Sequence, residues 1–278
     1  VPELDWAARE SLSRKAALHV VRAYHLSEGT LPWASYVDRE LTADLRQAAR
    51  SHLDAALAHL ARKWPEVPAT GTAVDGPAAD VLVARSATGA LTVVGSRRLG
   101  ALGGIALGSV STVVAAAAGG PVVVAGGPAA LPGEAAEVVV GVDGGEQTGD
   151  VLGFAFDHAS RHGRPLHAVF CWPRDLLADA RWRAPQPGPE RADRWLAEQL
   201  AGWQEKYPDV PVRRGVVRDH AVAGLVAASA GQELLVVGSH SRHARVAALL
   251  GSVSQGVLHH ATCPVAIVHP AAPPAPAG

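Results

Sequence analysis

The sequence has little of the chemistry that marks secreted or membrane proteins. It contains two cysteines, no methionine, and no apolar run approaching the roughly 20 residues that span a bilayer. Cys171 and Cys263 would lie in different domains and cannot build a disulfide framework, so a reducing compartment is the simplest interpretation. Residues 1–6 carry acids rather than the basic start of a signal peptide. We therefore expect a soluble, cytoplasmic protein.

The chain also lacks a surplus of charge. Its formal net charge is −1, which gives no electrostatic basis for binding nucleic acid or an anionic membrane surface. Of its 278 residues, 48% are hydrophobic and 18% are charged, so it can bury a core and is not disordered. The length suits one large domain or two of ordinary size.

A duplication decides between these alternatives. Three stretches of the first half recur 143 residues later: residues 91–96 at 234–239, residues 107–111 at 250–254, and residues 120–124 at 263–267. A constant offset indicates a tandem repeat without insertion over that span. Residues 18–19 match 166–167 at an offset of 148, so only the connections between the matched stretches differ in length.

Each copy alternates short apolar runs with helical stretches. In the second copy, strands are predicted at 138–142, 166–170, 212–217, 234–238 and 265–268, and helices at 150–162, 190–207, 221–230 and 252–260. The strands are rich in β-branched residues and several are continuously apolar, as strands buried on both faces are. Alternating strands and helices without tight hairpins predict a doubly wound, five-stranded parallel sheet in an α/β fold.

The first copy has matching pieces except one. Its predicted strands are 18–24, 68–73, 91–95 and 122–125, and its first helix is 1–15, but nothing matches residues 138–142. Because a doubly wound sheet places its first strand centrally, a domain without that strand has a divided core. We expect the natural chain to have a strand before Val1, ending in an acid comparable to Asp143. The alternative is a degenerate domain that borrows a strand from another chain.

The domain boundaries follow from composition. Residues 1–132 form the first domain and 133–269 the second, joined by a Gly- and Pro-rich linker at 126–133. Residues 270–278 are a Pro/Ala tail with nothing to bury, which predicts disorder.

The chemistry concentrates where predicted strands end. Gly238 ends a strand, a polar loop follows, and Gly251-Ser252 opens the next helix. Glycines let the backbone approach an anion, and the free N–H groups of a helix start attract phosphate. Asp143 ends the first strand of the copy, and the carboxyl ends of the strands meet at one edge. By itself Gly251-Ser252 indicates a helix cap; together with Gly238 and Asp143 it predicts a phosphate-binding edge.

These motifs make the chain resemble the universal stress protein family. Nucleotide-binding members have Gly-Val-Asp-Gly at the first strand's end, here 141–144, and a Cys-Pro-Val-like entry to the last strand, here 263–265. They also have Gly, two residues, Gly, nine residues, then Gly-Ser or Gly-Thr, here 238–252. The resemblance implies tandem domains of the adenine nucleotide alpha hydrolase-like fold. It also implies ATP as ligand, with Mg²⁺ accompanying the phosphates, and the following site in the second copy: Asp143, Gly238, Ser239, His240, Ser241, Gly251 and Ser252.

Two departures weaken the pattern. The second motif glycine is Ser241 in the second copy and Arg98 in the first. Serine at position 241 could still offer a hydroxyl to a phosphate, so binding in the second copy is impaired at most. Arg98 could pair with a phosphate, but its bulk favours a filled site. The degenerate site in the first copy consists of Gly95, Arg98, Gly108 and Ser109.

No catalytic or metal constellation emerges from the sequence. There is no Gly-x-Ser-x-Gly elbow and no Walker lysine, so we expect a binding protein rather than an enzyme. Slow ATP hydrolysis or autophosphorylation occurs in parts of the family. We expect no metal site, because His259 and His260 come without a carboxylate or cysteine at ligand spacing, and His240 is more plausible as a phosphate donor. Trp195 and Trp203 lie eight residues apart on one helix and are expected in the core or at an interface rather than in a base-stacking platform.

Two hypotheses for function remain. The first is a stress-response module that binds ATP or a related adenine nucleotide, mainly in the second copy. The second is an interaction or regulatory protein of the same fold that binds no nucleotide. In the family the last strands of two domains pair, so residues 122–125 should lie antiparallel to 265–268 as an intramolecular pseudo-dimer. A homodimer of the whole chain is a further expectation. Neither nucleic acid nor a membrane is expected as a partner.

Overall fold

The computed structural model describes residues 2–26, 34–98, 105–106, 108–126, 133, 135–172, 188–239 and 250–270. The first repeat contains α1 (Pro2–Arg14), β1 (Leu18–Tyr24), α2 (Ala34–Lys63), β2 (Ala69–Asp75), α3 (Ala78–Ser86), β3 (Thr92–Gly95), β4 (Arg97–Arg98), β5 (Ile105–Ala106), α4 (Ser109–Ala117) and β6 (Val122–Ala125). The second contains β7 (Val138–Gly141), α5 (Thr148–His162), β8 (Leu166–Cys171), α6 (Pro189–Lys206), β9 (Val212–Val217), α7 (Ala221–Ser229), β10 (Leu234–Gly238), α8 (Ser252–His260) and β11 (Val265–Val268).

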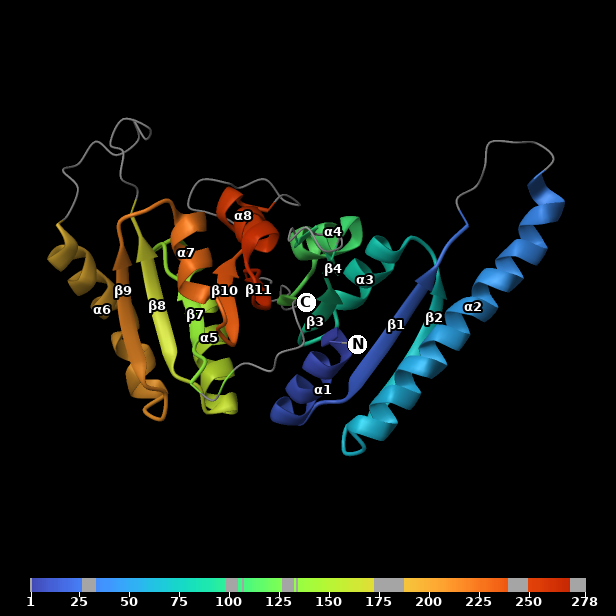
Figure 1. Ribbon diagram of the computed structural model, residues 1–278, viewed down its shortest axis with the longest axis horizontal. Helices are drawn as coiled ribbons and strands as arrows, with labels where there is room; N and C mark the ends of the chain where they lie inside the picture. The colour runs from blue at the N-terminus through green and yellow to red at the C-terminus, as the bar shows by residue number, and fades with distance from the viewer. Residues whose placement is uncertain are drawn as a thin grey trace, which may run out of the picture.

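One sheet runs through both repeats (Figure 1). Its seven strands follow the order β3-β6-β11-β10-β7-β8-β9. Every neighbouring pair is parallel except β6 and β11, which are antiparallel, with Val265 opposite Val124 and Ile267 opposite Val122. The predicted pairing of the two last strands is therefore confirmed.

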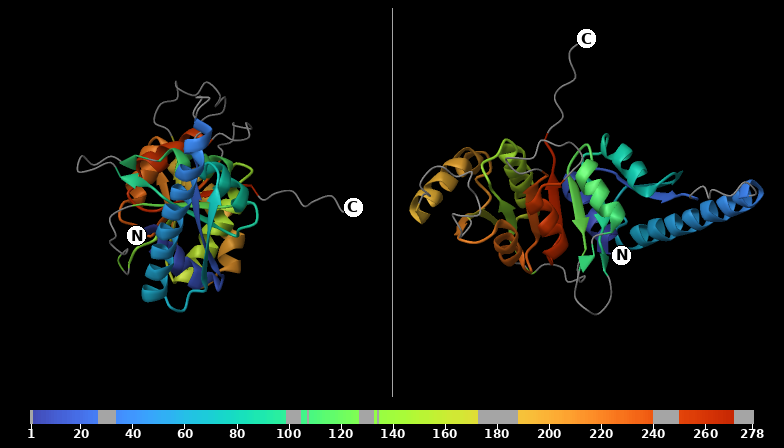
Figure 2. Two further views of the ribbon diagram at one scale, coloured as in Figure 1. Left: turned by 90° about the vertical axis from the view of Figure 1, so that its right-hand side faces the viewer. Right: turned by 90° about the horizontal axis from the view of Figure 1, so that it is seen from above.

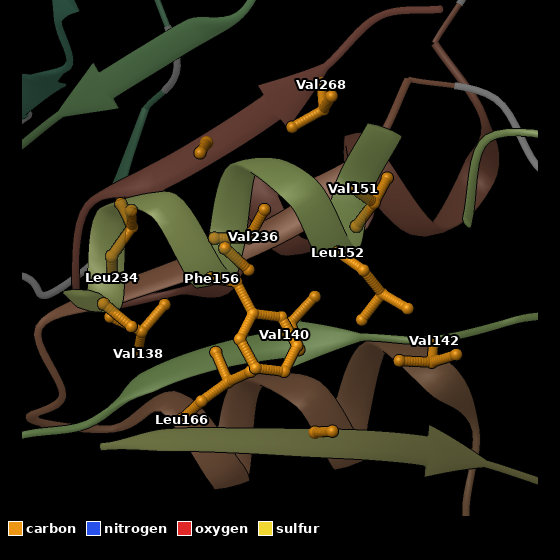
Figure 3. Close-up of a cluster of buried hydrophobic side chains, with 14 of the residues drawn as sticks. Val138, Val140, Val142, Val151, Leu152, Phe156, Leu166, Leu234, Val236 and Val268 are labelled. Atoms are coloured by element: carbon orange, nitrogen blue, oxygen red, sulfur yellow. The ribbon is translucent and has the colours of Figure 1, made fainter. Parts of the chain in front are cut away.

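The second repeat is the doubly wound, five-stranded parallel unit that the sequence predicts. Alternate side chains of its central strand enter opposite cores. Val138 and Val140 pack on α5 and α6, where Phe156 is fully buried, as Figure 3 shows for the α5 side. Val139 faces the other way, toward α7 and α8. Strands covered on both faces must be apolar at every position, which explains the continuous valine runs.

The first repeat is divided. β1 pairs with β2 in a separate two-stranded parallel sheet, whereas β3 joins the long sheet through β6. Among the described residues no strand of this repeat occupies the place that β7 has in the second, so β1 and β3 are not bridged. The expectation of a divided core is confirmed, and a strand before Val1 stays a prediction. The 30-residue helix α2 covers β1 and β2 and extends away from the long sheet (Figure 2).

Helix α1 connects the divided pieces. It contacts α2 and β1 on one side and β3, β6 and α5 on the other. Its Trp6 belongs to the same apolar core as Phe156 of the second repeat, whereas Ala8 belongs to a small cluster with Leu60 and Val67. None of the helices in the described ranges is long and apolar enough to cross a membrane.

Asp5 attaches α1 to the end of α2. Its carboxylate accepts hydrogen bonds from His59 Nε2 at 2.8 Å, Lys63 Nζ at 2.9 Å and Trp64 Nε1 at 2.9 Å. Burial alone would raise the pKa of the Asp5 carboxyl, but the hydrogen bonds from Lys63, Trp64 and His59 lower it well below its usual range. The ionised form is therefore bound more strongly in the folded than in the unfolded chain.

We predict that this carboxylate makes the first repeat sensitive to acid. Because its folded pKa is depressed, its contribution is complete above the unfolded pKa of about 4 and is lost as the pH falls toward the folded pKa. Asp5→Asn should lower the free energy of unfolding at pH 7 by about 1–3 kcal/mol and flatten its dependence on pH below about pH 5. Urea unfolding followed by circular dichroism at several pH values measures both effects.

Asp54 provides the control, because it lies on an exposed position of the same helix α2. Asp54→Asn should leave both the stability and the pH slope close to those of the parent protein. Equal slopes for the parent and Asp5→Asn would contradict the assignment.

Candidate functional site

A pocket lies at the carboxyl ends of β7 and β10. These two strands mark the point where the chain reverses its direction of winding: it moves from β7 outward to β8 and β9, then returns to β10 on the other side of β7. Loops that leave two adjacent parallel strands in opposite directions open a crevice between them. This is the position at which doubly wound sheets bind their ligands.

The pocket has an apolar wall and a polar mouth. Its lining includes the apolar Val142, Val169, Leu225 and Val237 and the polar Asp143, Gln147, Thr148 and Ser254. Gly141 lies at its base, where an added Cβ would come within 3.1 Å of Leu225 Cδ1. A glycine at this strand end therefore keeps space that a side chain would fill.

Asp143 is exposed at the mouth, as the strand-edge argument predicts. Its Oδ1 accepts a hydrogen bond from the Gly145 amide at 2.8 Å, a local turn that orients the carboxylate. The left-handed φ of 72° at Gly144 allows the chain to turn there toward α5.

Helix α8 begins beside the end of β10. The Gly251 amide donates to the Ser239 carbonyl at 2.8 Å, and the Ser254 hydroxyl donates to the Gly238 carbonyl at 2.5 Å. The first bond within the helix runs from the Gln255 amide to the Gly251 carbonyl, so the amides of residues 252–254 have no acceptor inside the helix. Such a helix start attracts anions.

The helix-cap interpretation of Gly251-Ser252 holds for Gly251. Gly251 is the N-cap residue, with φ −61° and ψ 153°, and it makes no side-chain capping bond, whereas Ser252 is the first residue of the helix and is exposed. Its side chain is therefore accessible to a ligand at the helix start. Val253, the next residue, lines the pocket.

Ser239 takes a different place from the one its motif position predicts. It is fully buried, its amide donates to the Val268 carbonyl at 2.8 Å, and its hydroxyl accepts a bond from Gln147 Nε2 at 3.3 Å. These contacts make it a residue that holds the ends of β10 and β11 and the start of α5 together. His240 and Ser241 lie outside the described residues.

The first repeat shares part of this geometry. Helix α4 begins at Ser109 with Gly108 as N-cap, and the Ser111 hydroxyl donates to the Gly95 carbonyl at 2.6 Å, the counterpart of the bond from Ser254 to Gly238. One feature differs: a Cβ added at Gly95 would lie 3.3 Å from the carboxyl carbon of Glu3. An acid therefore faces the strand end at which phosphates would be held. Arg98 lies in β4, where its backbone pairs with Ile105.

Sequence reasoning located the polar edge but missed the apolar wall and Glu3. The wall combines residues from β7, β8, β10 and α7, and only the alternation of side chains along each strand could have pointed to it. Trp195 and Trp203 are partly buried and pack against the core, with ring centroids 4.9 Å from Phe170 and 6.0 Å from Phe156 respectively. His259 and His260 are exposed at the end of α8.

A tandem doubly wound α/β protein with a crevice at the switch point of its second repeat is the class that this fold and site define. The chain belongs to the universal stress protein family, because the model of that family matches residues 4–126 and 136–269. Those two matches correspond to the two repeats and confirm the resemblance drawn from the motifs.

Individual relatives agree with this assignment. The universal stress protein Rv1996 of Mycobacterium tuberculosis H37Rv is 33% identical over 300 residues, which cover 99% of this chain and 93% of that protein. The universal stress protein Rv2005c of the same strain is 44% identical over 179 residues, which cover 64% of this chain and 61% of that relative's length. A solved universal stress protein from Archaeoglobus fulgidus DSM 4304 has a TM-score of 0.68 at 16% identity, covering 96% of this chain and 93% of the other, and shows the shared fold.

Cys171 yields a prediction for this site. It lines the pocket, and burial, aided by the charge of Asp219, raises the pKa of its thiol to about 11. Burial likewise raises the pKa of Cys263 to about 11. Because the thiolate is the reactive form, both cysteines should react with iodoacetamide at pH 8 at least about tenfold more slowly in the folded protein than in urea. Mass spectrometry of the alkylated peptides measures each rate, and a fast folded-state reaction at Cys171 would contradict its placement.

Proposed function

We propose that the second repeat binds ATP or a related adenine nucleotide and that the protein acts as a stress-response binding module. The observation that carries this proposal is the meeting of two features at the switch point between β7 and β10. One is a pocket whose apolar lining suits a flat ring, and the other is a helix start whose first amides have no acceptor inside the helix. A nucleotide has a flat base that suits the pocket at one end and charged phosphates that suit the helix start at the other.

The base fits the apolar end of the site. Val142, Val169, Leu225 and Val237 provide the apolar contacts that an adenine ring needs. Asp143 at the mouth can accept hydrogen bonds from ribose hydroxyls or from the amino group of the base, because an ionised carboxylate only accepts. The turn to Gly145 uses one of its oxygens and orients the other.

The phosphates fit the start of α8. The amides of residues 252–254 and the exposed Ser252 hydroxyl are donors at the positive end of the helix dipole. Mg²⁺ would accompany the phosphates. The bonds from Gly251 to Ser239 and from Ser254 to Gly238 hold the helix start in register with β10, so these donors are positioned before a ligand arrives.

Binding is expected to be asymmetric between the repeats. Among the described residues of the first repeat, no strand corresponds to β7. In addition, the carboxyl group of Glu3 lies next to Gly95. A carboxylate beside Gly95 would repel a phosphate bound at this strand end. The second hypothesis, an interaction protein without nucleotide, becomes the conclusion if the intact chain does not bind ATP.

Ser252→Glu should remove binding at the phosphate end without harming the fold. A carboxylate in the first turn of α8 is favourable for the helix, by about 0.3–1 kcal/mol, but it competes with phosphate for the same amides and repels it. We expect the affinity for Mg-ATP to fall at least about tenfold, which corresponds to about 1.4 kcal/mol. Isothermal titration calorimetry measures the change.

The repeat supplies a matched control for this variant. Ser109 is the first residue of α4, is exposed, and lies 143 residues before Ser252. Ser109→Glu should leave ATP binding unchanged. Equal losses in both variants would contradict the asymmetric site, and no loss in Ser252→Glu would reject the phosphate position.

Ala221→Leu tests the apolar end. Ala221 is the first residue of α7 and lines the pocket, so three added carbons would occupy space assigned to the base. We expect at least about a tenfold loss of affinity, because overfilled packing costs about 1–3 kcal/mol. Ala78 begins α3 at the equivalent position of the first repeat, and Ala78→Leu should bind ATP as the parent does. If Ala221→Leu binds ATP unchanged in calorimetry, the base does not occupy this pocket.

A further inference from the structure

A cluster of buried titratable residues lies where the two repeats meet, apart from the candidate nucleotide site. Glu10 comes from α1 of the first repeat, and His158 and His162 come from α5 of the second. Helix α5 starts at the carboxyl end of β7 and returns toward the amino end of β8. Its last turns therefore lie at the amino ends of the strands, whereas Asp143 lies at their carboxyl ends. The cluster is therefore independent of the pocket described above.

We propose that Glu10, His158 and His162 bind a zinc-class divalent cation that links the two repeats. The three ligand atoms all lie within 4.8 Å of one another. Glu10 Oε2 is 2.8 Å from His162 Nε2 and 3.3 Å from His158 Nδ1. Four-coordinate zinc with bonds of about 2.0–2.1 Å places its ligand atoms about 3.4 Å apart, so small side-chain movements suffice.

The spacing of the histidines suits this role. Residues four apart on a helix lie on one face, and the ring centroids of His158 and His162 are 4.3 Å apart. Two imidazoles and a carboxylate form a nitrogen and oxygen donor set that suits zinc and its neighbours in the first transition series rather than Mg²⁺ or Ca²⁺. A water molecule can take the fourth position, since the described residues offer three ligands in this group.

His158 provides an independent indication of a ligand. Its side chain is fully buried, yet neither ring nitrogen makes a hydrogen bond of good geometry with any residue that the structure describes. The contact with Glu10 lacks hydrogen-bond geometry, although the two side chains are close. A fully buried imidazole whose polar contacts are only these imperfect ones with two carboxylates is costly, and a cation between Nδ1 and the Glu10 carboxylate would satisfy it.

The surroundings resemble the outer layer of a metal site. Glu233 Oε1 lies 4.0 Å from His158 Nε2, which is beyond hydrogen-bond distance, and would have to move closer to accept the N–H of a histidine that binds metal through Nδ1. The rings of Trp6 and Phe154 are nearly parallel to that of His158, with centroids 6.0 Å and 6.4 Å away, so the imidazole packs among aromatic side chains.

Three arginines and an aspartate lie beside the carboxylates of this cluster. Arg14 Nε binds Glu10 Oε1 at 2.5 Å and leaves Oε2 toward the two rings. Arg9 and Arg164 both pair with Glu233, and Asp157 lies 3.6 Å from Arg14. Glu10 therefore directs Oε2 to the histidines, whereas Glu233 Oε1 lies between Arg9 and His158.

The expected consequence is a metal-dependent junction. The cation would have ligands on helices from different repeats, so it would stabilise the packing of α1 on α5. The full chain, expressed without a histidine tag and stripped with EDTA, should bind one equivalent of Zn²⁺ in calorimetry. Co²⁺ should give the visible absorption of a four-coordinate site, and Zn²⁺ should raise the midpoint of urea unfolding.

Substitutions identify the ligands. Glu10→Gln and His158→Gln each remove a ligand and should weaken Zn²⁺ binding at least about a hundredfold. Glu233→Gln removes only a residue beside a ligand, and such a change costs about ten- to a hundredfold in metal affinity, so its loss should be smaller. His260→Gln is the matched control, since His260 belongs to an exposed histidine pair. It should bind Zn²⁺ as the parent does. If His158→Gln does not fold, His162→Gln at the edge of the cluster tests the same site.

Absence of stoichiometric Zn²⁺ binding would overturn the proposal and leave a buried ion-pair network. Binding that survives Glu10→Gln and His158→Gln but is lost in His260→Gln would also overturn it and assign the metal to surface histidines. Ser252→Glu should still bind Zn²⁺, and His158→Gln should still bind ATP, so failure of this site and failure of the nucleotide site are distinguishable.

Discussion

The antiparallel pairing of β6 with β11 is the contact on which the rest of the structure depends. It joins two sheets into one and covers the outer edge of each. Val122, Val123, Ala266 and Ile267 in these strands are fully buried. The core of the second repeat also continues across this junction, because it includes Trp6 and Val123 of the first. The two repeats therefore form one packed body at their junction rather than two domains on a flexible linker.

This pairing also brings equivalent helices of the two repeats together. Glu10 and His158 lie 148 residues apart, the same offset as the start of β1 and β8, so they occupy equivalent positions across the junction. Trp6 and Phe154 are related in the same way. A pseudo-twofold arrangement places a residue near its own counterpart, and here divergence of the repeats has put an acid on one side and a histidine on the other.

The repeats have diverged in what their strand edges can hold. Both keep the glycine before the helix and the serine that binds the preceding strand, as Gly108 with Ser111 and Gly251 with Ser254 show. In the second repeat this geometry lies beside a pocket with an apolar wall. The conserved bonds are thus structural, since they attach a helix to a strand end, and the wall determines what the edge can bind.

The sequence by itself determined the tandem repeat, the parallel order of the second sheet and the polar edge with Asp143, Gly238 and Gly251. These follow from local patterns, namely a constant offset, apolar strands and glycines at strand ends. Antiparallel pairing of the last strands was predicted through the family resemblance. Tertiary structure alone decided the burial of Ser239, the approach of Glu3 to Gly95 and the meeting of Glu10 with His158 and His162. Each depends on side chains from elements far apart in the chain, and no local spacing records which helix face meets which partner.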